Sequence, residues 1–65
     1  MHRRLLAEEA VALGVRHIIR QRERIAELTR DGRDSQQAQK LLETLMALQK
    51  EHIAYRDQLL RELKS

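Results

Sequence analysis

The chain has 65 residues, a net charge of +3 and no cysteine or proline, and Tyr55 is its single aromatic residue. This composition excludes disulfide bonds, thiolate metal sites and a core built on aromatic side chains. One small all-α domain is expected, because the residue types that build and punctuate β-structure are scarce. A core of this size rarely contributes more than roughly 3–5 kcal/mol, so we expect self-association to add to its stability.

The N-terminus begins with basic residues, as a secretory signal peptide does, but Glu8 and Glu9 follow before any apolar run of useful length. The segment is therefore not expected to be a signal peptide. No window of the chain approaches the roughly 20 consecutive apolar residues that a membrane span requires. These features predict a soluble, cytoplasmic protein without membrane contacts.

Apolar residues in the first half of the chain recur with the period of an α-helix. The main stripe consists of Val11, Val15, Ile18, Ile25 and Leu28, and a seven-residue row beside it contains Leu5, Ala12, Ile19 and Ala26. The pattern predicts an amphipathic helix over about residues 3–30. Gly14 falls inside this helix at a cost of about 1 kcal/mol relative to alanine. A close backbone approach by a neighbouring helix would explain its presence.

Residues 31–34 are expected to form a turn. Gly32 stands where a helix that ends at Arg30 or Asp31 needs a residue in the left-handed conformation. Asp34 stands where the next helix needs an N-cap, and Gln37 follows three residues later as a capping-box partner. So short a connection predicts an antiparallel hairpin, because a flexible linker would be longer and richer in glycine and serine.

A second amphipathic helix is expected over about residues 35–63. Its main stripe consists of Ala38, Leu42, Leu45, Leu59 and Leu63, with Leu41 and Leu48 on one side and Met46, Ile53 and Leu60 on the other. A turn centred near residues 32 and 33 would place Val11 opposite Tyr55. The polar residues on or beside the two stripes are Arg22, Gln49, His52 and Arg56. They are expected either to be partly buried with their polar ends in water or to set the register of a partner helix.

The first helix has more apolar surface than one partner helix can cover. Leu6, Ala10 and Leu13 lie on a face away from the main stripe, and a helix that is apolar all round needs cover on all sides. Exposed apolar surface of this kind usually marks an interface. We therefore predict a homodimer in which two hairpins form a four-helix bundle. The predicted dimer interface consists of Leu6, Ala10, Leu13, Met46, Ile53 and Leu60.

The sequence lacks the spacing of common catalytic and metal sites. Ser35 has the position of a residue that opens a helix, and no serine is flanked by the glycines of a nucleophile motif. The Glu-x-x-His motif of di-iron helical proteins would need an acid at position 14 or 49 to serve His17 or His52, and glycine and glutamine stand there. We predict no catalytic site, cofactor, metal or small-molecule substrate. His2 and His17 need no ligand role, and His52 is expected in an interface.

The excess positive charge lies in the first half of the chain, where Arg16, Arg20 and Arg24 form a row at four-residue spacing. Such a row could bind the phosphates of RNA or DNA. Glu23 and Glu27 interleave with the row, and this helix has no aromatic residue for base stacking. Association with itself or with another helical protein is therefore the first prediction, and nucleic-acid binding is the alternative.

A resemblance to a group of short, uncharacterised bacterial helical-hairpin proteins lies in two segments, RHIIRQRERIAELTRDGRD (residues 16–34) and EHIAYRDQLLREL (residues 51–63). In that group a helix rich in His, Ile and Arg is joined through an Asp-Gly-x-Asp turn to a second helix with His, Arg and Leu-Leu near its end. The resemblance implies a stand-alone small protein or a terminal module, and it implies no particular activity.

Overall fold

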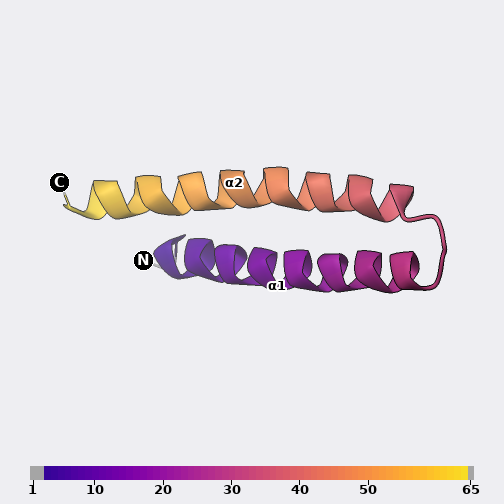
Figure 1. The fold of residues 1–65 in the computed structure, drawn as a ribbon. Coiled ribbons are helices and arrows are strands. Elements are labelled where there is room, and N and C mark those ends of the chain that lie inside the picture. The colour runs from indigo at the N-terminus through magenta and orange to yellow at the C-terminus, as the bar shows by residue number, and fades with distance from the viewer. Residues whose placement is uncertain (1–2, 65) are drawn as a thin grey trace.

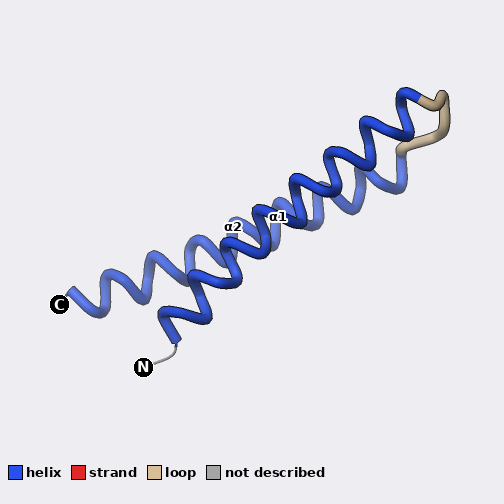
Figure 2. The backbone as a smooth tube through the Cα atoms, turned by 90° about the horizontal axis from the view of Figure 1, so that it is seen from below, coloured by secondary structure: helices blue, strands red, loops and turns tan. Residues whose placement is uncertain are grey.

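A computed structural model describes residues 3–64, which form two long helices and the turn between them. Helix α1 spans Arg3–Arg30 and helix α2 spans Gln36–Lys64. The helices lie side by side and run in opposite directions, so that both chain ends lie at one end of the molecule and the turn at the other (Figure 1). They cross one another along their length (Figure 2). The expected all-α antiparallel hairpin is confirmed.

The hairpin is a rod rather than a sphere. Its extents are 52 × 14 × 12 Å and its radius of gyration is 15.2 Å, against about 11 Å for a compact domain of this length. Its shape follows from two helices of nearly equal length that contact only each other. Every residue on the outer side of either helix is therefore exposed to solvent unless another molecule covers it.

The turn begins with a hydrogen-bonded stop at the end of α1. The amide of Gly32 donates to the carbonyl oxygen of Thr29 at 3.1 Å, and the amide of Arg33 donates to that of Leu28 at 2.8 Å. Gly32 has a φ of 69°, the left-handed conformation that favours glycine. These two bonds form a Schellman motif with Gly32 at the C′ position, as the sequence predicted.

The start of α2 differs by one residue from the expected cap. The carbonyl oxygen of Ser35 accepts the first helical bond, from the Gln39 amide at 2.9 Å, so Ser35 and not Asp34 is the N-cap. Asp34 still caps the helix, because its Oδ1 accepts the Gln36 amide at 2.9 Å. The capping partner is Gln39, which donates to the Ser35 hydroxyl, rather than the expected Gln37.

The helices meet along a seam of buried and half-buried residues whose spacing alternates between three and four. In α1 the seam contains Ala7, Val11, Gly14, Ile18, Gln21, Ile25 and Leu28, and in α2 it contains Ser35, Ala38, Leu42, Leu45, Gln49, His52, Arg56 and Leu59. This is the heptad spacing of a coiled coil. The predicted stripe of α1 was wrong in one respect, because Val15 is exposed while Gly14 and Gln21 face α2.

The core along this seam is thin. The buried apolar side chains are those of Ala7, Ala38 and Leu59, and the remaining buried residues are Gln21 and Gln49. Within residues 3–64, no large side chain is completely buried. Small side chains bring the helices close together but remove little apolar surface from water, and that surface sets the hydrophobic gain.

Candidate interaction surface

Two buried glutamines join the helices at two levels of the seam. The Nε2 atom of Gln21 in α1 donates to the carbonyl oxygen of Ala38 at 2.8 Å, and the Nε2 atom of Gln49 in α2 donates to that of Val11 at 2.8 Å. Each bond runs from a side chain of one helix to the backbone of the other. Such bonds depend on the register of the two helices, because a shift of either helix would leave a buried amide unpaired.

Gly14 is the residue that admits Gln49 to the seam. A Cβ atom at position 14 would lie 2.7 Å from the Cδ atom of Gln49, well inside van der Waals contact. The close approach at Gly14 is therefore made by a side chain and not, as expected, by the backbone of the neighbouring helix. The Oε1 atom of Gln49 is buried here, and it has no hydrogen-bond partner among the described residues.

The register of the hairpin differs from the expected one. Val11 was expected opposite Tyr55, but its carbonyl oxygen binds Gln49, and Tyr55 lies beside Arg3. The cause is the turn, since Arg33 is hydrogen-bonded to Leu28 and the chain is already level with the last turn of α1 when α2 begins. Of the four polar residues expected near the stripes, Gln49, His52 and Arg56 lie on the seam and Arg22 is exposed.

Many large apolar side chains of the described chain remain exposed. They are Leu5, Leu6, Leu13, Val15, Ile19, Leu41, Met46, Leu48, Ile53, Tyr55 and Leu63. The accessible surface of the chain is 5536 Å², whereas a compact monomer of 7.7 kDa exposes about 4,300 Å². The hairpin thus leaves apolar surface in water that a globular domain of its mass would bury.

Apart from Leu63, the exposed apolar residues lie, together with half-buried Ala10 and Leu60, on two opposite faces of the hairpin, one on each side of the plane that contains both helices. One face carries Leu5, Ala12, Val15 and Ile19 of α1 and Met46, Ile53 and Leu60 of α2, and we call it the isoleucine face. The other carries Leu6, Ala10 and Leu13 of α1 and Leu41, Leu48 and Tyr55 of α2, and we call it the tyrosine face.

Contacts across the seam separate the two faces. On the isoleucine face Arg22 donates to the Met46 sulfur at 3.9 Å, and Ile18, Met46 and Ile53 line one groove of about 430 Å³. Arg3 lies beside Tyr55 on the tyrosine face. At 3.6 residues per turn, Leu13 points about 180° away from Arg22 around α1. Leu13 therefore cannot share a face with Met46.

The structure consequently does not bring the six predicted interface residues together. Met46, Ile53 and Leu60 lie on the isoleucine face, whereas Leu6, Ala10 and Leu13 lie on the tyrosine face. Four of the six are exposed, and Ala10 and Leu60 are half-buried. Val15 and Ile19 were not assigned to the interface from the sequence. Ile19 belongs to the seven-residue apolar row from Leu5 to Ala26, which the sequence showed, but the sequence did not show where that row lies relative to α2.

The row formed by Arg16, Arg20 and Arg24 is exposed along its whole length. Within residues 3–64 the ion pairs are Arg4 with Glu8 at 3.8 Å and Arg56 with Asp57 at 3.0 Å, and neither involves this row. The guanidinium groups of the row are thus available to an anionic ligand.

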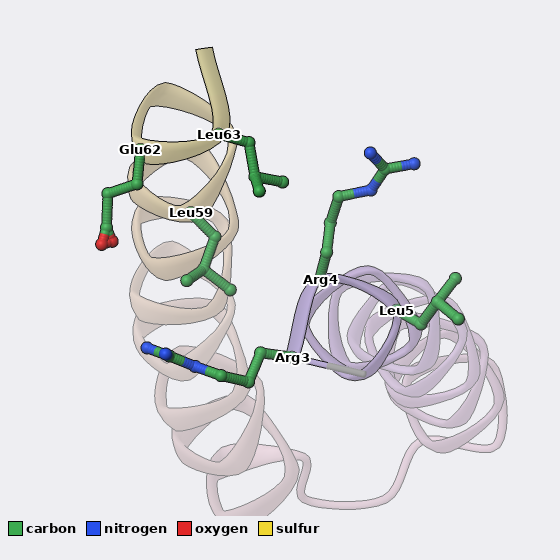
Figure 3. A pocket seen from close by; sticks show the side chains of 6 residues that line it. All are labelled: Arg3, Arg4, Leu5, Leu59, Glu62 and Leu63. Carbon is green, nitrogen blue, oxygen red and sulfur yellow. The ribbon is translucent and has the colours of Figure 1, made fainter. Parts of the chain in front are cut away.

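The open end of the hairpin has a groove of about 610 Å³, where the seam gives way to charged and exposed residues (Figure 3). Leu59 and Leu63 point from α2 into the space between the helices, while Leu5 points away from α2. Arg3 extends towards α2, where the hydrogen bond and charge of the Tyr55 side chain, and then the charge of Glu62, raise the pKa of Arg3 above its ordinary value.

The histidines do not assemble into a metal site in the described part of the chain. His17 is exposed, His52 is half-buried on the seam, and His2 lies outside the described residues. Among residues 3–64, no group of three or more His, Asp or Glu side chains could hold a metal ion.

Neither α1 nor α2 has an apolar stretch long enough to cross a membrane. Comparisons with known protein families, curated proteins and solved structures find no match for this chain.

Proposed function

We propose that this protein is a non-catalytic self-association module whose hairpin forms a homodimeric four-helix bundle. One observation carries the proposal: the apolar surface of α1 extends beyond the part that faces α2. Beside the seam, Val15 and Ile19 are 46% and 51% exposed, while Gly14 and Gln21 occupy positions that face α2. A helix whose apolar surface extends beyond its own hairpin partner needs a second layer to cover the remainder.

The stability of a lone hairpin supports the same proposal. Of the three buried apolar residues in the described chain, Ala7 and Ala38 have side chains of one carbon, and only Leu59 is large. The other large apolar residues of the seam are only half-buried, so the contact between the helices removes little apolar surface from water. Burial of apolar surface between two copies would add the stabilisation that the seam alone lacks.

The exposed area is of the size that a dimer interface requires. The chain exposes 5536 Å², about 1,200 Å² more than a compact monomer of its mass. A standard protein–protein interface buries roughly 800 Å² on each partner. Covering one of the two apolar faces would therefore remove most of the excess.

The test is sedimentation equilibrium of the purified chain over a wide concentration range, with helicity measured on the same samples by circular dichroism. We expect a dimer at micromolar concentration and a loss of helicity on dilution, since folding and association are linked. A fully helical monomer at micromolar concentration would overturn the proposal. The exposed faces would then be assigned to a different helical protein.

The exposed arginine row favours one alternative, a small basic regulator that binds RNA or DNA. Its test is a gel-shift titration at several salt concentrations on the wild type and on a variant with Arg16, Arg20 and Arg24 changed to alanine. Phosphate binding predicts an affinity that falls steeply with salt and is lost in the variant. Equal, weak binding by both proteins would remove this alternative.

A further inference from the structure

We infer that the second copy docks on the isoleucine face, with the two hairpins antiparallel so that their turns lie at opposite ends of the bundle. The inference rests on the self-association proposed above and adds the face and the orientation. It places Met46, Ile53 and Leu60 in the interface, together with Val15 and Ile19, and it leaves Leu6, Ala10 and Leu13 outside.

The two faces differ in how far apolar surface extends on α1. On the isoleucine face, the exposed residues of α1 adjoin the half-buried seam residues Val11, Ile18 and Ile25, so apolar surface is continuous from the seam outward. On both faces the row of α1 beside the seam carries two charged residues, Arg3 and Arg24 on the tyrosine face and Glu8 and Arg22 on the isoleucine face. The next row outward separates the faces, because it carries Arg20 and Glu27 on the tyrosine face and is wholly apolar on the isoleucine face. A charge buried in a bundle without a partner is costly.

The orientation of the two copies depends on the outer row of the isoleucine face on each helix. On α1 this row is apolar and contains Leu5, Ala12, Ile19 and Ala26. On α2 the equivalent row is charged and contains Glu43, Lys50, Asp57 and Lys64. If the hairpins packed parallel, α1 of each copy would face α2 of the other and the apolar row would meet the charged one. Antiparallel packing places α1 on α1 and α2 on α2, so that like rows meet.

The charges along these helices are self-complementary when one copy is reversed. The row on α2 alternates in sign at seven-residue intervals, and so does the row on the outer side of α1 that contains Glu9, Arg16, Glu23 and Arg30. Reversal places Arg16 against Glu23 of the second copy. It likewise places Glu43 against Lys50 of the second copy. Opposite charges that meet at the rim of an interface steer association and set the register.

These two pairings are compatible, because they centre the symmetry axis at about the same level of the hairpin on both helices. Pairing Arg16 with Glu23 centres the axis near Ile19 on α1, and pairing Glu43 with Lys50 centres it near Met46 on α2. The packing of Gln49 on Gly14 places Met46 within about three residues of Ile19, or roughly 4.5 Å along the helix. The 3.9 Å contact between Arg22 and Met46 agrees with this placement.

The face is tested by sedimentation equilibrium on matched aspartate variants. Ile19→Asp and Ile53→Asp change the isoleucine face, while Leu13→Asp and Leu48→Asp change the tyrosine face. The two pairs are matched, because the exposed fractions of all four side chains lie between 36% and 51%. We expect at least a hundredfold weaker dimer for the first pair and a change below about threefold for the second. The reverse order of effects would overturn the choice of face.

The orientation is tested by distances between spin labels, since the chain has no native cysteine. Labels on Arg33→Cys of both copies should lie near the 52 Å length of the hairpin in an antiparallel dimer and less than half as far apart in a parallel one. In a mixture of labelled Arg33→Cys and labelled Lys64→Cys chains, the antiparallel dimer should also show a short distance, because each turn meets the open end of the other copy. A short distance between two Arg33→Cys labels would overturn the orientation.

Charge reversal gives a second readout of the register. Arg16→Glu or Glu23→Arg alone should weaken the dimer about tenfold, and the double variant should restore most of the loss. Additive losses in the double variant would contradict the pairing. A monomeric wild type would overturn the self-association proposal itself, whereas a wild-type dimer that fails only the label or charge tests would overturn this inference alone.

Discussion

Gln49 lies directly on Gly14, and its Nε2 atom donates to the carbonyl oxygen of Val11 one turn earlier in α1 at 2.8 Å. The two helices are therefore in contact at a point where one has no side chain and the other has a long polar one. Replacement of a helical glycine by alanine usually stabilises a protein, but at Gly14 this contact should make the same change destabilising.

The first prediction is that Gly14→Ala destabilises the protein. At an open helical site the change would stabilise by about 1 kcal/mol, but here the new Cβ atom collides with Gln49, and we expect a net loss of about 1–3 kcal/mol. Urea unfolding at one fixed protein concentration measures it. In a Gln49→Ala background the same substitution should stabilise, because the collision is gone. An equal gain in both backgrounds would show that Gln49 does not pack on Gly14.

The second prediction concerns the other buried glutamine. Gln21→Ala removes the hydrogen bond to the carbonyl oxygen of Ala38 and leaves a space in the seam, and the expected cost is about 1–3 kcal/mol. The matched control is Gln37→Ala, an exposed glutamine near the same end of the hairpin, with an expected change within about 0.5 kcal/mol. Superimposable thermal melts for the two variants would contradict the burial of Gln21.

The third prediction tests the end of α1. Gly32→Val should cost about 1–2 kcal/mol, because a β-branched residue is strained at a φ of 69°. No atom lies within 4 Å of the position that its Cβ would take, so the loss comes from the backbone and not from a clash. Gly32→Asn should lose less, since asparagine tolerates this conformation. Equal thermal melts for Gly32→Val and the wild type would show that residue 32 is not the C′ residue.

The fourth prediction tests the start of α2. Asp34→Ala removes the oxygen that accepts the Gln36 amide and should cost about 1 kcal/mol. Asp34→Asn keeps a side-chain oxygen and should retain most of the stability. Thermal melts followed by circular dichroism compare the three proteins. If Asp34→Asn loses as much as Asp34→Ala, the stabilisation comes from the charge near the helix N-terminus and not from the cap.

The turn was the part of the fold most predictable from sequence. A glycine at C′ and an acidic or hydroxyl residue at the next helix start act within a few residues, so local chemistry determines them. The one-residue error at the cap arose because Asp34 and Ser35 are both good capping residues. The register was less predictable, because it depends on the path of the turn and on the contact between Gln49 and Gly14.

The faces could not be predicted for a different reason. An apolar stripe shows which side of a helix is buried, but it does not show which of several neighbours buries each part of that side. The stripe through Val11 and Val15 was therefore centred to one side of α2, and Gly14 and Gln21, which the stripe omitted, also face α2. Leu13 and Met46 look equivalent in the sequence, and only the direction of the seam separates them.

Arg3 and Lys64 both lie at the open end of the hairpin, and the turn with Gly32 lies at the far end. Any domain joined to either helix would emerge at that open end. In the antiparallel dimer that we propose, the two open ends would point in opposite directions, at a separation near the 52 Å length of the rod. The bundle would then act as a spacer that holds two attached domains apart at a fixed distance.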